Sequence, residues 1–312
     1  MKFGYLSVNT ADGIHPGDLG RELEQRGFES VWMPEHSHLP VDSAVTFPDP
    51  SIVMPDGYAH MMNPFISLTA AAATTSRLTL GTGMSLGLEH ELLDLACTAA
   101  SLDVLSESRL ILGLGVGWNA EELRNARPDV PFKKRYSALR ERVTALRAAW
   151  GGDNTYPEFD GPYADTAWGK QISSFSGEFD RFSPSWVFPK PGRGSIPVAL
   201  GLAGPLGMQH AAEYADIWGP VDTALRDADG QVDVAGGIER FRRTVEQAGR
   251  DPDGVKITLF NISSVTDDMI EHYASLAIER FVFGPGTFMR HPAAATLQRL
   301  DALQKYIDQY SN

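Results

Sequence analysis

The stretch RLILGLGVGWNAEE, residues 109–122, is the strongest single indication of the fold. Residues 110–114 are apolar on both alternating faces, which is typical of a parallel strand covered on both sides. Gly113, Gly115 and Gly117 then remove side chains where this strand ends, so that backbone can approach a ligand or another backbone closely. Because ligands of α/β folds bind at the C-terminal ends of parallel strands, the stretch predicts both the architecture and the functional face.

These glycines do not match a dinucleotide-binding turn. That fingerprint requires Gly-x-Gly-x-x-Gly at the start of a helix and an acidic residue about 20 residues later. Counted from Gly113, the third position is Trp118, and counted from Gly115 it is Ala120. No clear second strand ending in an acidic residue follows, and we therefore do not expect a Rossmann-type site.

Strand-like runs alternate with helix-like runs from one end of the chain to the other. The predicted strands are residues 3–8, 30–33, 78–84, 110–114, 197–202, 217–221, 256–262 and 280–283. Eight such repeats predict a (β/α)8 TIM barrel. Residues 151–195, rich in Gly, Pro, Ser and aromatic residues, are too long for an ordinary connection. We expect a single domain over residues 1–312 with a lid-like insertion at about 151–195, before the fifth strand.

Composition excludes several classes of partner. The 312 residues are 43% hydrophobic, enough for a large core, and carry a net charge of −13. Such a charge argues against binding to nucleic acid or to an anionic membrane surface, but it does not exclude an anionic cofactor at a locally positive site. The one cysteine, Cys97, allows no disulfide within the chain, and no apolar run reaches transmembrane length. We expect a cytoplasmic protein.

Glu35, His36, Ser37 and His38 follow the second predicted strand, and three interpretations of them are open. The His-x-His pair is similar to the metal ligands of amidohydrolase barrels, His36 is suited to acid–base chemistry or cofactor contact, and a loop histidine can be purely structural. A metal site would need further ligands at later strand ends. The remaining candidates fall on predicted helices or helix starts, so we expect no metal: His90, His210, His272 and His291.

Three further strand ends carry candidate site residues, each with two open interpretations. The two glycines of LGTGM, residues 80–84, indicate either close approach of a ligand or a bulge at the barrel rim. PVALGLAGPLG, residues 197–207, is either an anion site at a helix start or a tight turn. Trp118 is placed to stack on a planar cofactor, whereas the acidic residues of the same helix start are also explained by capping: Glu121 and Glu122.

Together these segments resemble the bacterial luciferase-like monooxygenase superfamily, most closely its branch of deazaflavin-dependent oxidoreductases. Five segments carry the resemblance, in the family's order and spacing. They are GRELEQRGFESVWMPEH (20–36), LTLGTGMSL (78–86), LDVLSESRLILGLGVGWNAEE (102–122), FSGEFDRFSPSWVFPKP (175–191) and PVALGLAGPLGMQHAAEYADIW (197–218). The resemblance implies a (β/α)8 barrel with a flavin or deazaflavin across its C-terminal face.

The resemblance also assigns roles to residues. It implies a cis non-prolyl bulge at Gly83–Met84 and a cofactor-contacting or proton-donating role for His36. The implied cofactor contacts are Glu35, His36, Gly83, Met84, Trp118, Asn119, Ala203, Gly204, Leu206 and Gly207, the last four through backbone amides. One departure is Ala120, which stands where the sugar-phosphate dehydrogenase branch has a catalytic Glu. That branch binds the substrate phosphate with cationic side chains. The sequence does not place these side chains here, and Lys190, Arg193 and Arg290 are no more than candidates.

The implied function is transfer of a hydride between a small organic substrate and C5 of a deazaflavin, coenzyme F420. Two alternatives are open: a monooxygenase that uses reduced FMN supplied by a separate flavin reductase, and a non-catalytic flavin-binding relative. The aromatic residues of the long loop at 41–60 and of the insertion either contact an apolar substrate or pack the lid. Since relatives are often dimers, a homodimer is a further implication.

Overall fold

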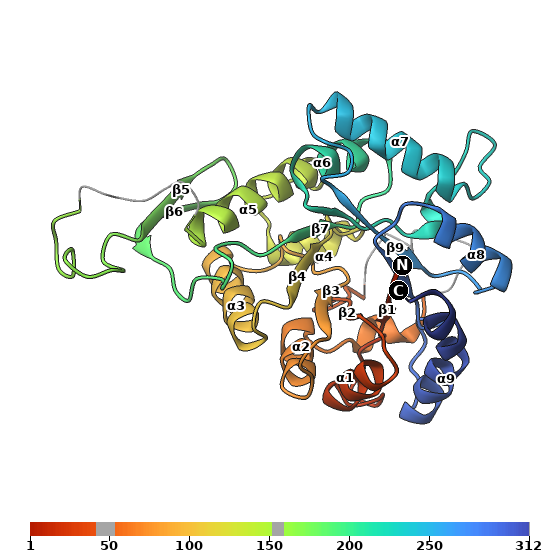
Figure 1. Cartoon of the computed structure of the whole chain (residues 1–312). Helices are drawn as coiled ribbons and strands as arrows, with labels where there is room; N and C mark the ends of the chain where they lie inside the picture. Colours follow the sequence, from red (N-terminus) through yellow and green to blue (C-terminus); the bar gives the residue numbers. More distant parts are fainter. Residues whose placement is uncertain (42–53, 152–158, 312) are drawn as a thin grey trace. The chain divides into compact units, whose positions relative to one another are not determined.

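Eight parallel strands close into a barrel in a computed structural model that describes residues 1–41, 54–151 and 159–311 (Figure 1). Their order around the barrel is β1-β2-β3-β4-β7-β8-β9-β10. The bounds are β1 (Lys2–Leu6), β2 (Ser30–Met33), β3 (Thr79–Thr82), β4 (Leu110–Leu114), β7 (Val198–Leu200), β8 (Ile217–Trp218), β9 (Lys256–Asn261) and β10 (Arg280–Phe283). All eight predicted strands are present, which confirms the (β/α)8 TIM barrel.

Helices separate the barrel strands along the chain. They are α1 (Pro16–Gln25), α2 (Pro64–Ala72), α3 (Leu92–Leu105), α4 (Ala120–Ala126), α5 (Arg135–Ala149), α6 (Pro205–Tyr214), α7 (Val234–Gln247), α8 (Asp267–Ser275) and α9 (Ala293–Tyr310). Short 3-10 turns add to them in the described residues: η1 (Asp56–His60), η2 (Phe132–Lys134) and η3 (Asp222–Ala224). The predicted insertion before the fifth barrel strand contains an antiparallel pair, β5 (Ile172–Ser176) and β6 (Arg181–Trp186).

The chain divides into two compact units. The first comprises residues 1–85, 111–115 and 197–312, and therefore holds the barrel strands, apart from Leu110 at the start of β4, with α1, α2 and α6 to α9. The second comprises residues 86–110 and 116–196, with α3, α4, α5 and the β5–β6 hairpin. The single-domain organisation and the lid role of residues 151–195 stay predictions.

Large apolar side chains fill the barrel interior. Trp32 of β2 and Phe260 of β9 are both buried and meet edge to face, with ring centroids 5.0 Å apart. Around them pack the other members of one buried cluster: Leu6, Ile111, Ala199, Ile217 and Val282. Each large side chain buried in this way contributes roughly 1.5–3 kcal/mol to stability. The interior is thus a packed core, so ligand chemistry belongs at the strand ends.

An ion pair closes the N-terminal end of the barrel. Arg280, at the start of β10, is 3% exposed and donates to both carboxylate oxygens of Glu29, over 2.6 and 2.7 Å. Its Nη1 also donates to Thr258 Oγ1, over 3.2 Å. Burial opposes ionisation of Glu29, but the hydrogen bonds and charge of Arg280 outweigh it and hold the pKa of this carboxyl below its ordinary value of 4.5. The pair therefore stabilises the folded barrel only while Glu29 is ionised.

Glu29→Gln is expected to destabilise the protein by roughly 2 kcal/mol at pH 7. This is less than the about 3–5 kcal/mol of a fully buried pair, because the Glu29 side chain is 25% exposed. Since the folded-state pKa is depressed, the stabilisation is complete above pH 4.5 and is lost as the pH falls through the folded-state pKa. Urea denaturation from pH 7 to pH 3 should show the two proteins converging in acid.

Glu279→Gln is the matched control, because Glu279 pairs with Lys2 on the exposed surface. We expect it to change the free energy of unfolding by less than about 1 kcal/mol. A constant difference between the wild type and Glu29→Gln across this pH range would contradict the assignment.

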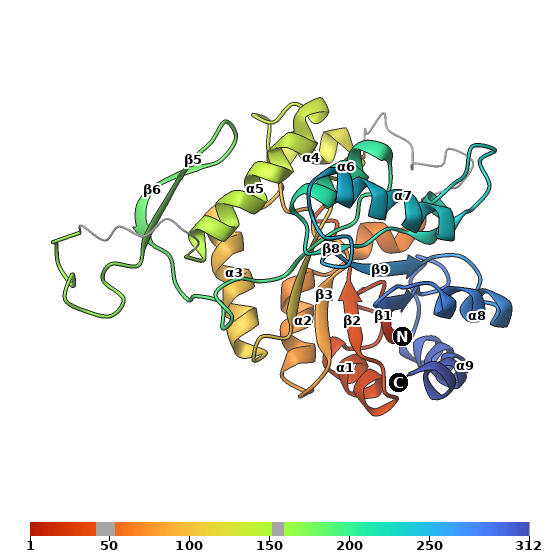
Figure 2. The ribbon, with the colours of Figure 1, turned by 45° about the horizontal axis from the view of Figure 1, so that its top comes forward.

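In the second unit, a buried arginine joins α5 to the hairpin turn. Arg142 is 1% exposed and binds both oxygens of Asp180, over 2.7 and 2.8 Å. It also donates to the backbone carbonyls of Gly87 and His90, over 2.7 and 2.6 Å. Glu141, one residue earlier, accepts the backbone N–H groups of residues 178–180. Figure 2 shows β5 and β6 running beside α5. Charged groups of α5 thus hold the turn of this hairpin.

Candidate functional site

The chain makes the expected bulge where β3 ends. The peptide bond between Gly83 and Met84 is cis, as the family resemblance implies. Around it, Thr82 Oγ1 and Ser85 N both donate to the carbonyl of Gly113, over 2.7 and 2.8 Å. Gly83 N donates to the Met33 carbonyl over 2.7 Å. The bulge is therefore tied to both neighbouring strands, β2 and β4.

The Met84 side chain occupies a space that glycines of three strand ends leave open. A β-carbon at Gly113 would lie 2.8 Å from Met84 Sδ, one at Gly201 would lie 2.6 Å from its Cγ, and one at Gly219 would lie 3.0 Å from its Cε. Met84 packs against the interior cluster and is only partly buried. Gly113, interpreted from sequence as a point of ligand or backbone approach, thus accommodates Met84 and the carbonyl of Thr82, which would be 2.0 Å from its β-carbon.

Gly201→Ala is expected to destabilise the protein by about 1–3 kcal/mol, because the added carbon overlaps Met84. In a double-mutant cycle with Met84→Ala, the cost of Gly201→Ala should fall to near zero, as measured by urea denaturation.

Gly113→Ala is the matched comparison. Its added carbon meets the backbone of Thr82, so Met84→Ala should not relieve its cost. Additive effects of Gly201→Ala and Met84→Ala on the free energy of unfolding would show that Gly201 is not required to make room for the Met84 side chain.

Glu35 and His36 lie directly after β2, and both are buried, at 6% and 9% exposure. Ser85, immediately after the bulge, is fully buried and donates its hydroxyl to Glu35 Oε2 over 2.5 Å. This bond links the end of β2 to the end of β3. It brings two predicted site residues, Glu35 and Met84, to adjacent strand ends of one barrel. Ser85 had no signal of its own in the sequence.

Aromatic rings flank His36. The Tyr58 ring of η1 lies 5.3 Å from the imidazole, and the Phe288 ring lies 5.3 Å beyond Tyr58 (centroid distances). Burial raises the pKa of Tyr58 to about 12, so its hydroxyl stays protonated near neutral pH. The sequence prediction included Tyr58 only among the aromatic residues of the loop at 41–60, as a substrate contact or a packing residue, because this stretch carries no periodic pattern that would place any one of them.

Arg290 joins the turns around these three rings. Its Nε donates to Asp56 Oδ2 over 2.8 Å, and its Nη1 donates to Asp12 Oδ2 over 3.2 Å. The sequence offered Arg290 as a candidate for binding a substrate phosphate. In the structure it is already paired with two carboxylates and ties the β10–α9 loop to η1 and to the β1–α1 loop. Of the other two candidates, Lys190 donates to the Ala149 carbonyl over 2.9 Å within the second unit, which also contains Arg193.

The predicted backbone-amide segment leads from β7 into α6. Ala203 is half-buried, Gly204 and Leu206 are exposed, and Gly207 packs tightly against Leu202. A β-carbon at Gly204 would meet nothing within 4 Å, and no side chain caps this helix start. Gly201 lies two residues before Ala203 and directly contacts the space filled by the Met84 side chain. This segment therefore begins beside the bulge.

Trp118 and Asn119 belong to the second unit. Asn119 is buried and caps α4, because its Oδ1 accepts the N–H groups of Glu121 and Glu122 over 3.0 and 3.2 Å. Trp118 is partly buried. The sequence prediction assigned the capping of this helix start to Glu121 and Glu122, whereas the side-chain cap is Asn119; the two acidic residues lie in the first turn. The cofactor contacts of Trp118 and Asn119 stay predictions.

A second buried polar group lies at the ends of β8 and β9 and has no counterpart in the sequence predictions. Asp222 is 1% exposed, and its Oδ2 accepts hydrogen bonds from Asn261 Nδ2 and Ser263 Oγ, each over 2.7 Å. Its Oδ1 accepts the backbone N–H groups of Thr223 and Ile262, over 2.8 and 3.2 Å. Four donors on one buried carboxylate fix the loop that follows β8.

Comparison with known proteins identifies the family. The model of the luciferase-like monooxygenase family matches residues 1–312. The chain belongs to this family. An uncharacterised protein of Mycobacterium tuberculosis is 33% identical over 307 residues, 97% of this chain and 98% of that protein.

Members of the luciferase-like family similar to this chain include an F420-dependent glucose-6-phosphate dehydrogenase of Amycolatopsis mediterranei. It is 25% identical over 80% of this chain and 67% of that protein. Among solved structures, a monooxygenase from Streptomyces bottropensis has a TM-score of 0.70 and 17% identity, and the match covers all of both chains. This likeness shows the fold. The family match and the similarity to an F420-dependent oxidoreductase show that the chain is an enzyme. No helix in its described part is long and apolar enough to cross a membrane.

Proposed function

We propose that this luciferase-like enzyme is an oxidoreductase that binds coenzyme F420 at the C-terminal end of its barrel and transfers a hydride between that cofactor and a small organic substrate. The cofactor supplies hydride chemistry at ring carbon C5 when it is bound, and the protein supplies orientation and electrostatics. The observation that carries the proposal is the placement of Met84, Glu35 and His36 at adjacent strand ends, linked by the hydrogen bond from Ser85 to Glu35.

The residues at this end of the barrel fit a planar ring system. Ligand sites of this kind combine an apolar surface with a few placed polar groups. The Met84 side chain fills the space left by Gly113, Gly201 and Gly219, and it supplies a partly exposed apolar surface next to the packed core. Gly204 leaves open space beside the backbone where a cofactor's ribityl or phosphate group could be contacted.

His36 is the proposed catalytic residue. Its imidazole would hold the substrate's oxygen and give or take the proton that balances hydride transfer. The Tyr58 ring fixes one side of the imidazole, and the Arg290 ion pairs fix the segment that carries Tyr58. Glu35 is held by Ser85 beside it. The rings of Tyr58 and Phe288 also limit the access of water to this side of His36.

Two findings bear on the choice of cofactor and substrate. The similarity to an F420-dependent dehydrogenase supports coenzyme F420. The family description and the Streptomyces monooxygenase support the alternative, a monooxygenase that uses reduced FMN from a flavin reductase. Ala120 stands where the sugar-phosphate dehydrogenase branch is expected to have its catalytic Glu, so we do not propose a sugar phosphate as the substrate.

Titration of the purified protein with coenzyme F420 and with FMN, oxidised and reduced, tests the proposal by fluorescence and absorbance. We expect micromolar binding of F420 and weaker binding of FMN. Tighter binding of reduced FMN would replace the proposal with the monooxygenase alternative. Binding of neither cofactor would overturn the cofactor site as a whole.

A further inference from the structure

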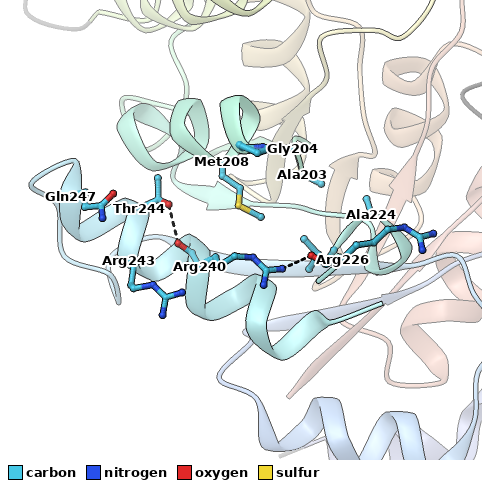
Figure 3. Close-up of a pocket in the computed structure, with 11 residues that line it drawn as sticks. Ala203, Gly204, Met208, Ala224, Arg226, Arg240, Arg243, Thr244 and Gln247 are labelled. Atoms are coloured by element: carbon cyan, nitrogen blue, oxygen red, sulfur yellow. Dashed lines mark hydrogen bonds between the residues drawn. The ribbon is translucent and has the colours of Figure 1, made fainter. Parts of the chain in front are cut away.

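An open pocket lies between α6 and α7 in the barrel unit. Its volume is about 430 Å³, and it reaches from Ala203 and Gly204 before α6 to Thr244 and Gln247 on α7. Figure 3 shows Gly204 and Met208 on one side, opposite Arg240 and Thr244 on the other. The loop after β8 closes one end, with Arg226 among its lining residues. The pocket therefore begins at the backbone segment that the proposed function assigns to the cofactor.

The lining of this pocket is positively charged in a strongly negative protein. Its described lining residues include Arg226, Arg240 and Arg243 and no carboxylate, whereas the whole chain has a net charge of −13. Arg240 and Arg243 pair with Asp233 and Glu239 on exposed surface, where such pairs contribute little. Arg226 donates to the Gly230 carbonyl, and within the described residues no carboxylate lies within ion-pair distance of it. A local positive field of this kind attracts anions.

The elements that carry these arginines are fixed in place. Arg240 Nη2 donates to the Arg226 carbonyl over 2.8 Å, and Asp233 accepts the N–H of Gly236 at the start of α7 over 2.9 Å. The buried Asp222 holds the same loop at its start, through Ser263 and Asn261. Because the backbone is held at both ends, binding an anion here requires the ordering of arginine side chains only.

We infer that this arginine-lined pocket binds the carboxylate groups of the cofactor's anionic tail, an inference that rests on the proposed function. Coenzyme F420 carries glutamate residues beyond its phosphate, whereas FMN ends at a single phosphate. Guanidinium groups bind carboxylates through paired, charge-assisted hydrogen bonds. The pocket extends along α7, beyond the segment at Ala203 and Gly204 that would contact the phosphate, and so has room for carboxylates that FMN lacks.

A set of ligands that differ only in the tail tests this inference. The ligands are F420 with its glutamates, the F420 form that ends at its phospholactyl group, the deazaflavin riboside without phosphate, and FMN. Binding to the wild type is measured by fluorescence titration at low and high salt. We expect the glutamates to tighten binding by about tenfold, which is 1.4 kcal/mol, and this gain to shrink at high salt.

The variant that carries the test is Arg226→Ala combined with Arg240→Gln. It should lose the glutamate-dependent gain and keep the wild-type Kd for the deazaflavin riboside. Arg242→Gln is the matched control, because Arg242 lies on the same helix but lines a different pocket, where it donates to the Ala277 carbonyl. This control should behave as the wild type with every ligand. Circular dichroism melting shows whether the double variant is folded.

The outcomes separate the inference from the proposed function. Equal affinity of the wild type for F420 with and without glutamates would overturn the inference and leave the proposed function standing. A double variant that weakens binding of the riboside as much as that of F420 would also overturn it. Binding of FMN with no binding of any deazaflavin would overturn both.

Discussion

Replacing His36 with alanine is expected to lower the rate of hydride transfer by about 10²- to 10⁴-fold, the usual contribution of a positioned acid or base. The imidazole is 9% exposed, lies between the end of β2 and the Tyr58 ring, and directly follows Glu35. Affinity for the cofactor should change much less, because Met84 and the backbone at Gly204 remain. The measurement compares the single-turnover rate of cofactor oxidation or reduction with the Kd of the cofactor, once a substrate has been found in a panel.

His272→Ala is the control for this experiment. His272 is exposed on α8 and has no place in the proposed site, so its loss should leave both the rate and the Kd unchanged. An unchanged rate in His36→Ala would remove His36 from the mechanism. An equal loss of rate and of cofactor affinity would show instead that His36 contributes to binding of the cofactor.

Asp180→Asn is expected to have the largest effect on stability, about 3–5 kcal/mol. The substitution keeps the shape of the side chain but leaves the charge of Arg142 buried without its partner. Asp180 is 5% exposed and also accepts from Arg127 over 3.3 Å. We expect the second unit to unfold at lower urea concentration, together with faster amide hydrogen exchange in α5 and in the β5–β6 hairpin.

Asp129→Asn provides the comparison, because Asp129 pairs with Arg127 but its side chain is 56% exposed. It should cost less than about 1 kcal/mol. A loss of stability in Asp180→Asn no larger than that of Asp129→Asn would show that the Arg142 ion pair does not hold the hairpin.

The strands were predictable where their sequence is mostly apolar and clearly bounded. Ser30–Met33, Leu110–Leu114 and Arg280–Phe283 match the predicted residues at both ends. The strand predicted at 217–221 is shorter, Ile217–Trp218, because Gly219 and Pro220 follow and proline cannot donate to a neighbouring strand. Whether a segment forms a buried strand can be predicted from its own apolar residues, whereas the length of the strand also depends on its pairing with the neighbouring strands.

The candidate site was only partly accessible to sequence reasoning. Glu35 and His36 were identifiable because they closely follow a predicted strand, and the Gly83–Met84 bulge because it ends one; all of them match a family pattern. Ser85 and the Asp222 group were not, and Tyr58 was included only as one of several aromatic residues at 41–60, since each gains its role from a partner distant in the chain. The arginines of the α6–α7 pocket come from a loop and a helix, and no local spacing connects them.

The sequence alone determined the (β/α)8 architecture, the family, and the strand ends at which the candidate site residues lie. These follow from apolar periodicity and from motifs that are contiguous in the chain. Only the tertiary structure showed that Gly113, Gly201 and Gly219 together make room for Met84, and that three arginines line one pocket without a carboxylate. Such features depend on distances between residues far apart in sequence, and those distances exist only once the strands have closed into a barrel.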